Sequence, residues 1–264
     1  MKKKLVEVVW IFSALLPVSR LEAQITSIGL KGGISIPSLE AGGGNNPLSS
    51  GYRSSFGPDA ALFAVWAFPG KFSVQCELEY STQGARRNGL QALAVPASYA
   101  AYFNPGTIVY ANFKAAVKLS YVMVPLMAKF QWKFRPSSPF YFYAEGGPFV
   151  GQLLTAKLVT SGISNVYADA SGQQPLLQTP LSFDTSINIV SQLHTTNFGA
   201  EANAGVSYHW GHCELFIEGG ANYGFLNIQQ GTANGRNTTG AASASAGYLF
   251  IFGRHARGSH SGAH

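Results

Sequence analysis

Hydrophobic and polar residues alternate with a period of two along most of this chain. In the stretch KFSVQCELEYSTQG, residues 71–84, apolar side chains occupy the even positions from Phe72 to Tyr80, and polar side chains such as Glu77 and Glu79 occupy the odd positions. Successive side chains of a β-strand point to opposite faces, whereas a helix would show a period of 3.6. The pattern therefore predicts a strand with one apolar face and one polar face.

Eight segments carry this alternation, and together they predict an all-β chain. Glycines interrupt the fifth segment, in which Glu145 is in phase with Tyr141 and Tyr143. The approximate bounds of the eight segments are 26–36, 59–68, 71–84, 120–134, 140–157, 197–210, 213–228 and 240–252.

The connections between these segments alternate between short turns and long loops. The short ones are PGK, RPSSP and GH, which join segments two to three, four to five and six to seven. Short turns rich in Gly and Pro are typical of antiparallel hairpins. An even number of strands with short turns at one end and long loops at the other is typical of outer-membrane barrels, where the short turns are periplasmic and the long loops extracellular. The prediction is an eight-stranded antiparallel up-and-down transmembrane β-barrel.

Composition indicates which face of the barrel contacts lipid. A soluble eight-stranded barrel alternates in the same way but places its apolar face inside. This chain is 46% hydrophobic and only 11% charged, whereas a soluble domain carries about 25% charged residues. Trp66, Trp132 and Trp210 all lie on the apolar face beside a short turn, where a membrane barrel has its aromatic girdle. We therefore expect the apolar face to contact lipid and these three tryptophans to mark a membrane interface.

The polar face would then point into the lumen, which side chains fill in an eight-stranded barrel. Buried charges need partners, so we expect ion pairs and hydrogen bonds among them rather than an open channel. The predicted network of lumen charges comprises Lys31, Glu77, Glu79, Lys129, Lys133, Glu145, Glu201, Glu214 and Glu218.

The two ends of the chain differ from the strand-forming part. A basic start, an apolar core (VVWIFSALLPV) and a small-residue site before Gln24 predict a signal peptide at 1–23. The barrel would occupy 24–252, and a tail rich in Gly, His and Ser at 253–264 is predicted to be disordered. The signal peptide carries four basic and two acidic residues, so its removal lowers the formal charge from +6 to +4. No clustered basic face remains, and we expect no nucleic-acid partner.

Candidate chemistry is sparse. Ser207 and His209 share one face, and Glu218 could approach them from the next strand, which suggests a lipid hydrolase. Their parity places them in the lumen, away from lipid, so the hypothesis is not favoured. The histidines lack zinc-ligand spacing and no phosphate-binding loop is present, so we expect no enzyme activity, no metal and no cofactor. Cys76 and Cys213 lie on strands that are not neighbours and are expected to stay unpaired.

Three stretches resemble a known family. LSYVMVPLMAKF (119–130), FYAEGGPFVGQLLTAK (142–157) and IGLKGGISI (28–36) are similar to segments of the PorT-like outer-membrane β-barrel family, often labelled "porin family protein", of Bacteroidetes. The resemblance covers 24–252 and implies an eight-stranded barrel in a Gram-negative outer membrane. Through the family's namesake it also implies a link to protein secretion, and it brings no catalytic residues. Members commonly end on the terminal aromatic of the last strand, whereas this chain continues from Phe252 to His264.

The functional expectation is a structural or binding barrel in the cell outer membrane. Its partner specificity would lie in the long loops, about 86–118 and 158–195, because loops on a rigid scaffold commonly carry binding function. The expected partners are outer-membrane lipid and an extracellular or secretion-machinery protein, with the barrel itself a monomer. The alternatives are a small diffusion pore and an outer-membrane lipid enzyme. Aromatic side chains suited to contacts in the loops are Tyr99, Tyr102, Phe103, Tyr110 and Phe113.

Overall fold

The computed structural model describes residues 25–42, 47–48, 51–95, 101–231 and 236–252. The predicted signal peptide, the predicted tail and Tyr99 lie outside these ranges. Within the described residues, no helix has the length and apolar character needed to cross a membrane.

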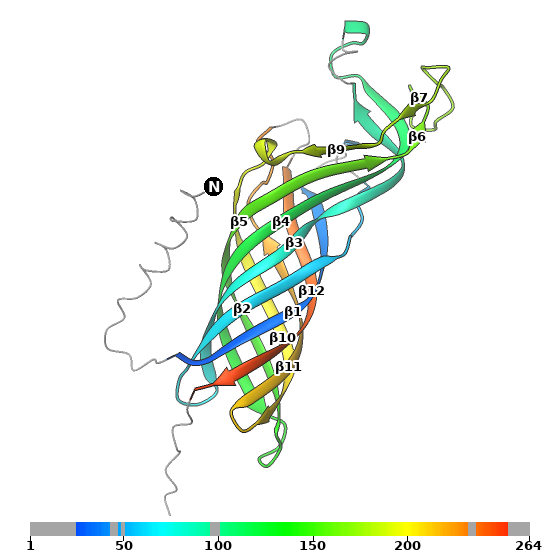
Figure 1. Cartoon of the computed structure of the whole chain (residues 1–264). Helices are drawn as coiled ribbons and strands as arrows, with labels where there is room; N and C mark the ends of the chain where they lie inside the picture. The colour runs from blue at the N-terminus through cyan, green and yellow to red at the C-terminus, as the bar shows by residue number, and fades with distance from the viewer. Residues whose placement is uncertain (1–24, 43–46, 49–50, 96–100, 232–235, 253–264) are drawn as a thin grey trace, which may run out of the picture.

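Eight long strands form one closed ring (Figure 1). Each of the eight strands pairs antiparallel with the next one along the chain, including β4 with β5. The first strand, β1, pairs with the last, β12, so the ring has no open edge. The predicted up-and-down barrel is therefore confirmed. Its strands are β1 (Ile25–Gly42), β2 (Gly57–Ala67), β3 (Phe72–Ala94), β4 (Ile108–Lys133), β5 (Phe140–Ser161), β10 (Thr196–Trp210), β11 (Cys213–Gly224) and β12 (Arg236–Ile251).

The two faces of the ring are separated as the alternation predicts. On β1, Leu30 is 56% exposed and Ile34 47% exposed, whereas Lys31 between them is 5% exposed. On β3, Leu78 is exposed while Glu77 and Glu79 are buried. The apolar side chains thus point out of the ring and the polar side chains point into it.

The ring is extended at one end. Strands β3, β4 and β5 contain 23, 26 and 22 residues, whereas a membrane-spanning strand needs about 9–11. They project together beyond the other strands (Figure 1). Smaller elements decorate this extension: β6 (Ile163–Ser164), β7 (Val166–Tyr167), β8 (Leu181–Ser182), β9 (Thr185–Asn188) and the 3₁₀ helix η2 (Val190–Gln192). We call the part of β3–β5 beyond the ring, with β6–β9 and the described connections between these strands, the extracellular extension, after the side on which the sequence predicts the long loops.

The predicted loop bounds were therefore wrong in part. Much of 86–118 is strand, because the pairing of β3 with β4 continues as far as Ala94 and Ile108. The third segment was expected to end at Gly84, but this glycine lies inside β3 with φ +132°, and a Cβ there would collide with the carbonyl of Val117. Glycine here permits a close approach within the sheet and does not end the strand.

Candidate functional site

Lys31 lies at the centre of the ionic network in the lumen. Its Nζ is 2.8 Å from Oε2 of Glu77 and 2.8 Å from Oε1 of Glu218. The hydroxyl of Tyr143 donates to Oε2 of Glu218 at 2.8 Å, and that of Ser245 donates to Oε1 at 3.1 Å. These five side chains come from β1, β3, β11, β5 and β12, so the cluster joins strands across the barrel.

A second group of charges surrounds Lys129 of β4. Its Nζ lies 3.5 Å from Oε2 of Glu145 and 3.9 Å from the centre of the Tyr143 ring, a cation–π contact. The amide of Gln75 donates to Glu77 at 2.7 Å and to Glu145 at 3.4 Å. Gln75 therefore connects the two groups.

Three further lumen carboxylates form no ion pair within the part of the chain that the structure describes. These are Asp59, Glu79 and Glu201, which are 6%, 3% and 7% exposed. Ser81 donates to Asp59 at 2.8 Å and Asn203 donates to Glu201 at 3.0 Å. Oε2 of Glu79 and Oε2 of Glu201 lack a hydrogen-bond partner among the described residues. The described lumen thus holds more carboxylates than lysines.

Two residues change the predicted list of lumen charges. Lys133 is exposed, at the end of β4, and its Nζ is 3.4 Å from the carbonyl of Pro136 in the short turn. It lies at the rim because the strand ends there, so its assignment to the lumen was wrong. Asp59 was missed, although its parity with the buried Ala61 and Phe63 would have placed it inside.

The lumen near the short turns holds His209 and Glu214. Nε2 of His209 is 2.8 Å from Oε2 of Glu214 and 3.3 Å from Oγ of Ser207. In a hydrolase triad, the nucleophile and the carboxylate contact different ring nitrogens. Here both contact Nε2, and Glu218 binds Lys31 instead, so the arrangement considered from the sequence is not formed.

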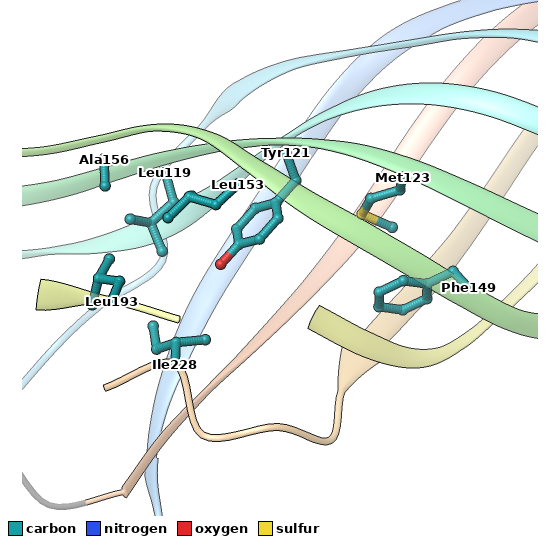
Figure 2. Packing of buried hydrophobic residues seen from close by; sticks show 8 residues of the cluster. All are labelled: Leu119, Tyr121, Met123, Phe149, Leu153, Ala156, Leu193 and Ile228. Carbon is teal, nitrogen blue, oxygen red and sulfur yellow. The ribbon is translucent and has the colours of Figure 1, made fainter. Parts of the chain in front are cut away.

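Apolar side chains fill the end of the lumen nearest the extension, which the alternation in the sequence did not predict. Side chains from β4 and β5 pack there against Leu193 and Ile228, which come from the connections that follow η2 and β11 (Figure 2). A bridge between Leu193 and Gln229 and a 2.7 Å hydrogen bond from the amide of Gln230 to the carbonyl of Leu193 hold these connections together. The members of this apolar plug, all at most 5% exposed, are Leu119, Tyr121, Met123, Phe149, Leu153, Ala156, Leu193 and Ile228.

Glycines make room for large rings in the lumen. The rings of Phe63 and Phe216 meet edge to face with their centres 5.8 Å apart, and Tyr143 meets Phe216 at 6.3 Å. A Cβ at Gly29 or Gly247 would collide with the ring of Phe63 or Phe216. The rings fill the narrow interior because these positions carry no side chain.

The three predicted girdle tryptophans lie on the outer face beside the short turns. Trp132 is 36% exposed and Trp210 41% exposed, and Trp66 is half-buried. Trp132 stacks between Phe130 and Phe142, with ring centres 6.3 and 5.8 Å away. This placement suits a headgroup-level position, which stays a prediction.

The extracellular extension carries exposed apolar side chains. Tyr102 is 83% exposed, Ile163 73% and Ile187 47%. Phe113, expected as a loop contact, is instead 5% exposed and stacks on Phe183 with ring centres 4.7 Å apart. It faces inward because 108–133 is strand and its parity is that of the lumen side.

A polar turn lies in the connection between β7 and β8. The hydroxyl of Ser171 and the backbone N–H groups of Ser171, Gln173 and Gln174 donate to the carboxylate of Asp169. Because these donors stabilise the charged form, they lower the pKa of Asp169 to about 2.

Other reactive groups are few. Among the described residues, no group of three or more His, Cys, Asp or Glu side chains is arranged to hold a metal ion. Cys76 and Cys213 are both free thiols.

A closed ring of eight strands, apolar outside and ionic inside, defines a transmembrane β-barrel. The family model described as "Outer membrane protein beta-barrel domain" matches residues 22–230. The chain belongs to this outer-membrane β-barrel family, and its place is the cell outer membrane. A search of curated proteins found no match.

Solved structures of small outer-membrane proteins are similar to this chain. Neisserial surface protein A has 14% identity and a TM-score of 0.43, with 88% of this chain and 100% of that chain covered. Ail of Yersinia pestis has 14% identity and a TM-score of 0.36, covering 86% and 100%. OprG of Pseudomonas aeruginosa has 10% identity and a TM-score of 0.38, covering 88% and 98%. At these identities and scores, the similarities carry no argument about function.

Proposed function

We propose that this protein is a non-enzymatic binding protein of the outer membrane, which holds a recognition surface on its extracellular extension. One observation carries the proposal: the described lumen is filled by an ionic network and an apolar plug, while three strands continue far beyond the ring. A filled lumen favours a scaffold over a passage for solutes.

The side chains on the extension favour a protein partner. Ile163, Leu177 and Ile187 are 73%, 42% and 47% exposed, and Tyr102 is 83% exposed. Protein contacts favour apolar and aromatic anchors at the centre of an interface. Ile163 and Ile187 lie on β6 and β9, which pair with β8 and β5, and this pairing restricts their backbone and so lowers the entropy cost of binding.

We further infer that the chain is a PorT-like member of its family and that its partner belongs to a protein-secretion assembly. This finer assignment is supported by the stretches at 28–36, 119–130 and 142–157, which resemble PorT-like sequences. The barrel would act as a monomer surrounded by outer-membrane lipid.

Site-specific photo-crosslinking on intact cells tests the recognition surface. A photoreactive residue is placed at Ile163 or Leu177 on the extension, and at the exposed Ser137 in a short turn as the control. The proposal predicts a discrete protein adduct from the first two positions and none from Ser137. Absence of an adduct at both extension positions, or the same adduct from Ser137, would refute it.

Single-channel recording in planar bilayers tests the rival function of a diffusion pore. Because ion pairs and the apolar plug fill the described lumen, we expect no stable conductance. Reproducible ohmic openings would favour the pore and count against a closed scaffold.

A further inference from the structure

A partly open cavity of about 230 Å³ lies at the extracellular mouth of the barrel. Residues from all sides of the mouth line it, including Leu39 of β1, Leu93 of β3, Phe113 of β4 and Leu158 of β5. Ile189 and Ile228, from the connections that fold over the mouth, complete the lining. The cavity is separate from the ionic network around Lys31 and from the exposed side chains of the proposed recognition surface.

Small side chains create the cavity. Ala92 of β3 and Ala115 of β4 are both 4% exposed and line it. Further along the same face of β4, Leu119 and Tyr121 fill the equivalent space with large side chains. On the inward face of β4, the cavity therefore lies beside the small Ala115, between the large residues Phe113 and Leu119.

The walls of the cavity are fixed before any ligand arrives. The backbone N–H of His194 donates to the carbonyl of Ile228 at 2.8 Å, and that of Gln230 donates to the carbonyl of Gln192 at 3.1 Å. Next to the lining residues Tyr52 and Arg87, Arg53 and Arg86 exchange backbone hydrogen bonds of 2.8 and 2.9 Å. A site with preformed walls needs little ordering when it binds.

The floor of the cavity separates it from the ionic lumen. Leu193 and Ile228 line the cavity and also belong to the apolar plug. A molecule that enters from outside thus meets packed apolar side chains and not the charges around Lys31. The cavity suits retention of a ligand more than its passage.

We propose that this cavity is a binding site for a small uncharged apolar molecule about the size of one substituted aromatic ring. An apolar cavity of about 150 Å³ is large enough to bind benzene, so 230 Å³ accommodates one ring with a short substituent. Gln192 and Gln229 also line the cavity and bring amide groups that suit a single hydroxyl on the ligand.

Arg87 is the charged residue in the cavity lining, and its guanidinium already interacts with groups of the protein, which favours an uncharged ligand. The guanidinium of Arg87 donates to the carbonyl of Leu48 at 3.0 Å and lies 4.5 Å from the centre of the Tyr52 ring. Arg87 therefore contacts Leu48 and Tyr52, which also line the cavity. A charged ligand would lose hydration among apolar side chains without comparable compensation.

Methyl NMR of the full chain in detergent micelles, titrated with p-cresol, tests the site. The methyl groups of Ile189 and Ile228 report on the cavity, and those of the outward-facing Ile28, Ile34 and Ile217 report on p-cresol that partitions into detergent. The proposal predicts saturable shifts at Ile189 and Ile228. Shifts confined to the outward-facing isoleucines would overturn it, and this comparison needs no variant.

Ala115→Phe fills the cavity and should weaken p-cresol binding by at least about tenfold. Ala116→Phe adds the same ring to the next residue of β4, on the opposite face and outside the cavity lining, and should leave binding unchanged. The milder Ala92→Leu is the second variant, and anomalous gel mobility of unboiled samples verifies that each variant is folded. Unchanged binding in folded Ala115→Phe or Ala92→Leu would overturn the proposal.

Discussion

Replacing Lys31 by Met should destabilise the barrel strongly, because it leaves two buried carboxylates without their cation. Nζ of Lys31 is 2.8 Å from an oxygen of Glu77 and 2.8 Å from an oxygen of Glu218. Coulomb's law with an effective dielectric constant of about 20 gives roughly 6 kcal/mol of attraction for each pair. Desolvation of the charges offsets much of this attraction.

The expected net loss is about 3–5 kcal/mol in the free energy of unfolding, the usual cost of removing one partner from a buried pair. Lys31 is 5% exposed, so bulk water does not replace the lost cation. The measurement is urea unfolding of the barrel in detergent, followed by tryptophan fluorescence and by gel mobility of unboiled samples.

Lys71→Met is the matched control, because Lys71 is exposed in the turn between β2 and β3. We expect it to change the free energy of unfolding by less than about 0.5 kcal/mol. Adding Glu77→Gln to Lys31→Met should cost less than the sum of the two single changes, since the two residues interact directly. A loss in Lys31→Met within about 1 kcal/mol of the control would refute the reasoning.

Three further predictions follow from the lumen and the extension. Glu79→Gln removes a buried carboxyl group that has no ion pair among the described residues, so it should leave the urea midpoint unchanged or raise it, whereas Glu77→Gln should lower it; equal losses would contradict this. Gly247→Val should cost about 1–3 kcal/mol through collision with Phe216, while Gly32→Val, with open space around it, should cost much less in the same unfolding assay. The carboxyl of Asp169 should titrate near pH 2 by NMR, because its pKa is lowered to about 2, so its hydrogen bonds persist at pH values below the usual carboxyl range and are lost only as the pH falls through about 2. A titration midpoint near pH 4 would contradict the turn geometry.

Most of the ring could be predicted because its strands have one apolar and one polar face. On β1 and β3 the outward positions are apolar and the inward ones polar, so the period of two identifies both the strand and its orientation. The residues Glu77 and Lys129 were recognised as lumen charges by parity alone. Their individual partners could not be assigned, because Lys31 joins β1 to β3 and β11 only once the ring has closed.

The apolar plug could not be predicted from the alternation. Around Leu119, Tyr121 and Met123, both faces of β4 are apolar, so parity no longer distinguishes lumen from lipid. The plug also depends on Leu193 and Ile228, which lie in connections without a strand pattern. Their inward position follows from long-range packing that a local pattern does not encode.

The sequence by itself determined the eight strands, the outward apolar face and the place in the outer membrane, because these depend on local alternation and on a shortage of charge. Only the tertiary structure decided how the lumen is filled, how far β3–β5 extend and where the cavity lies. These features depend on ring closure, which brings residues far apart in the chain into contact and gives each buried charge its particular neighbours.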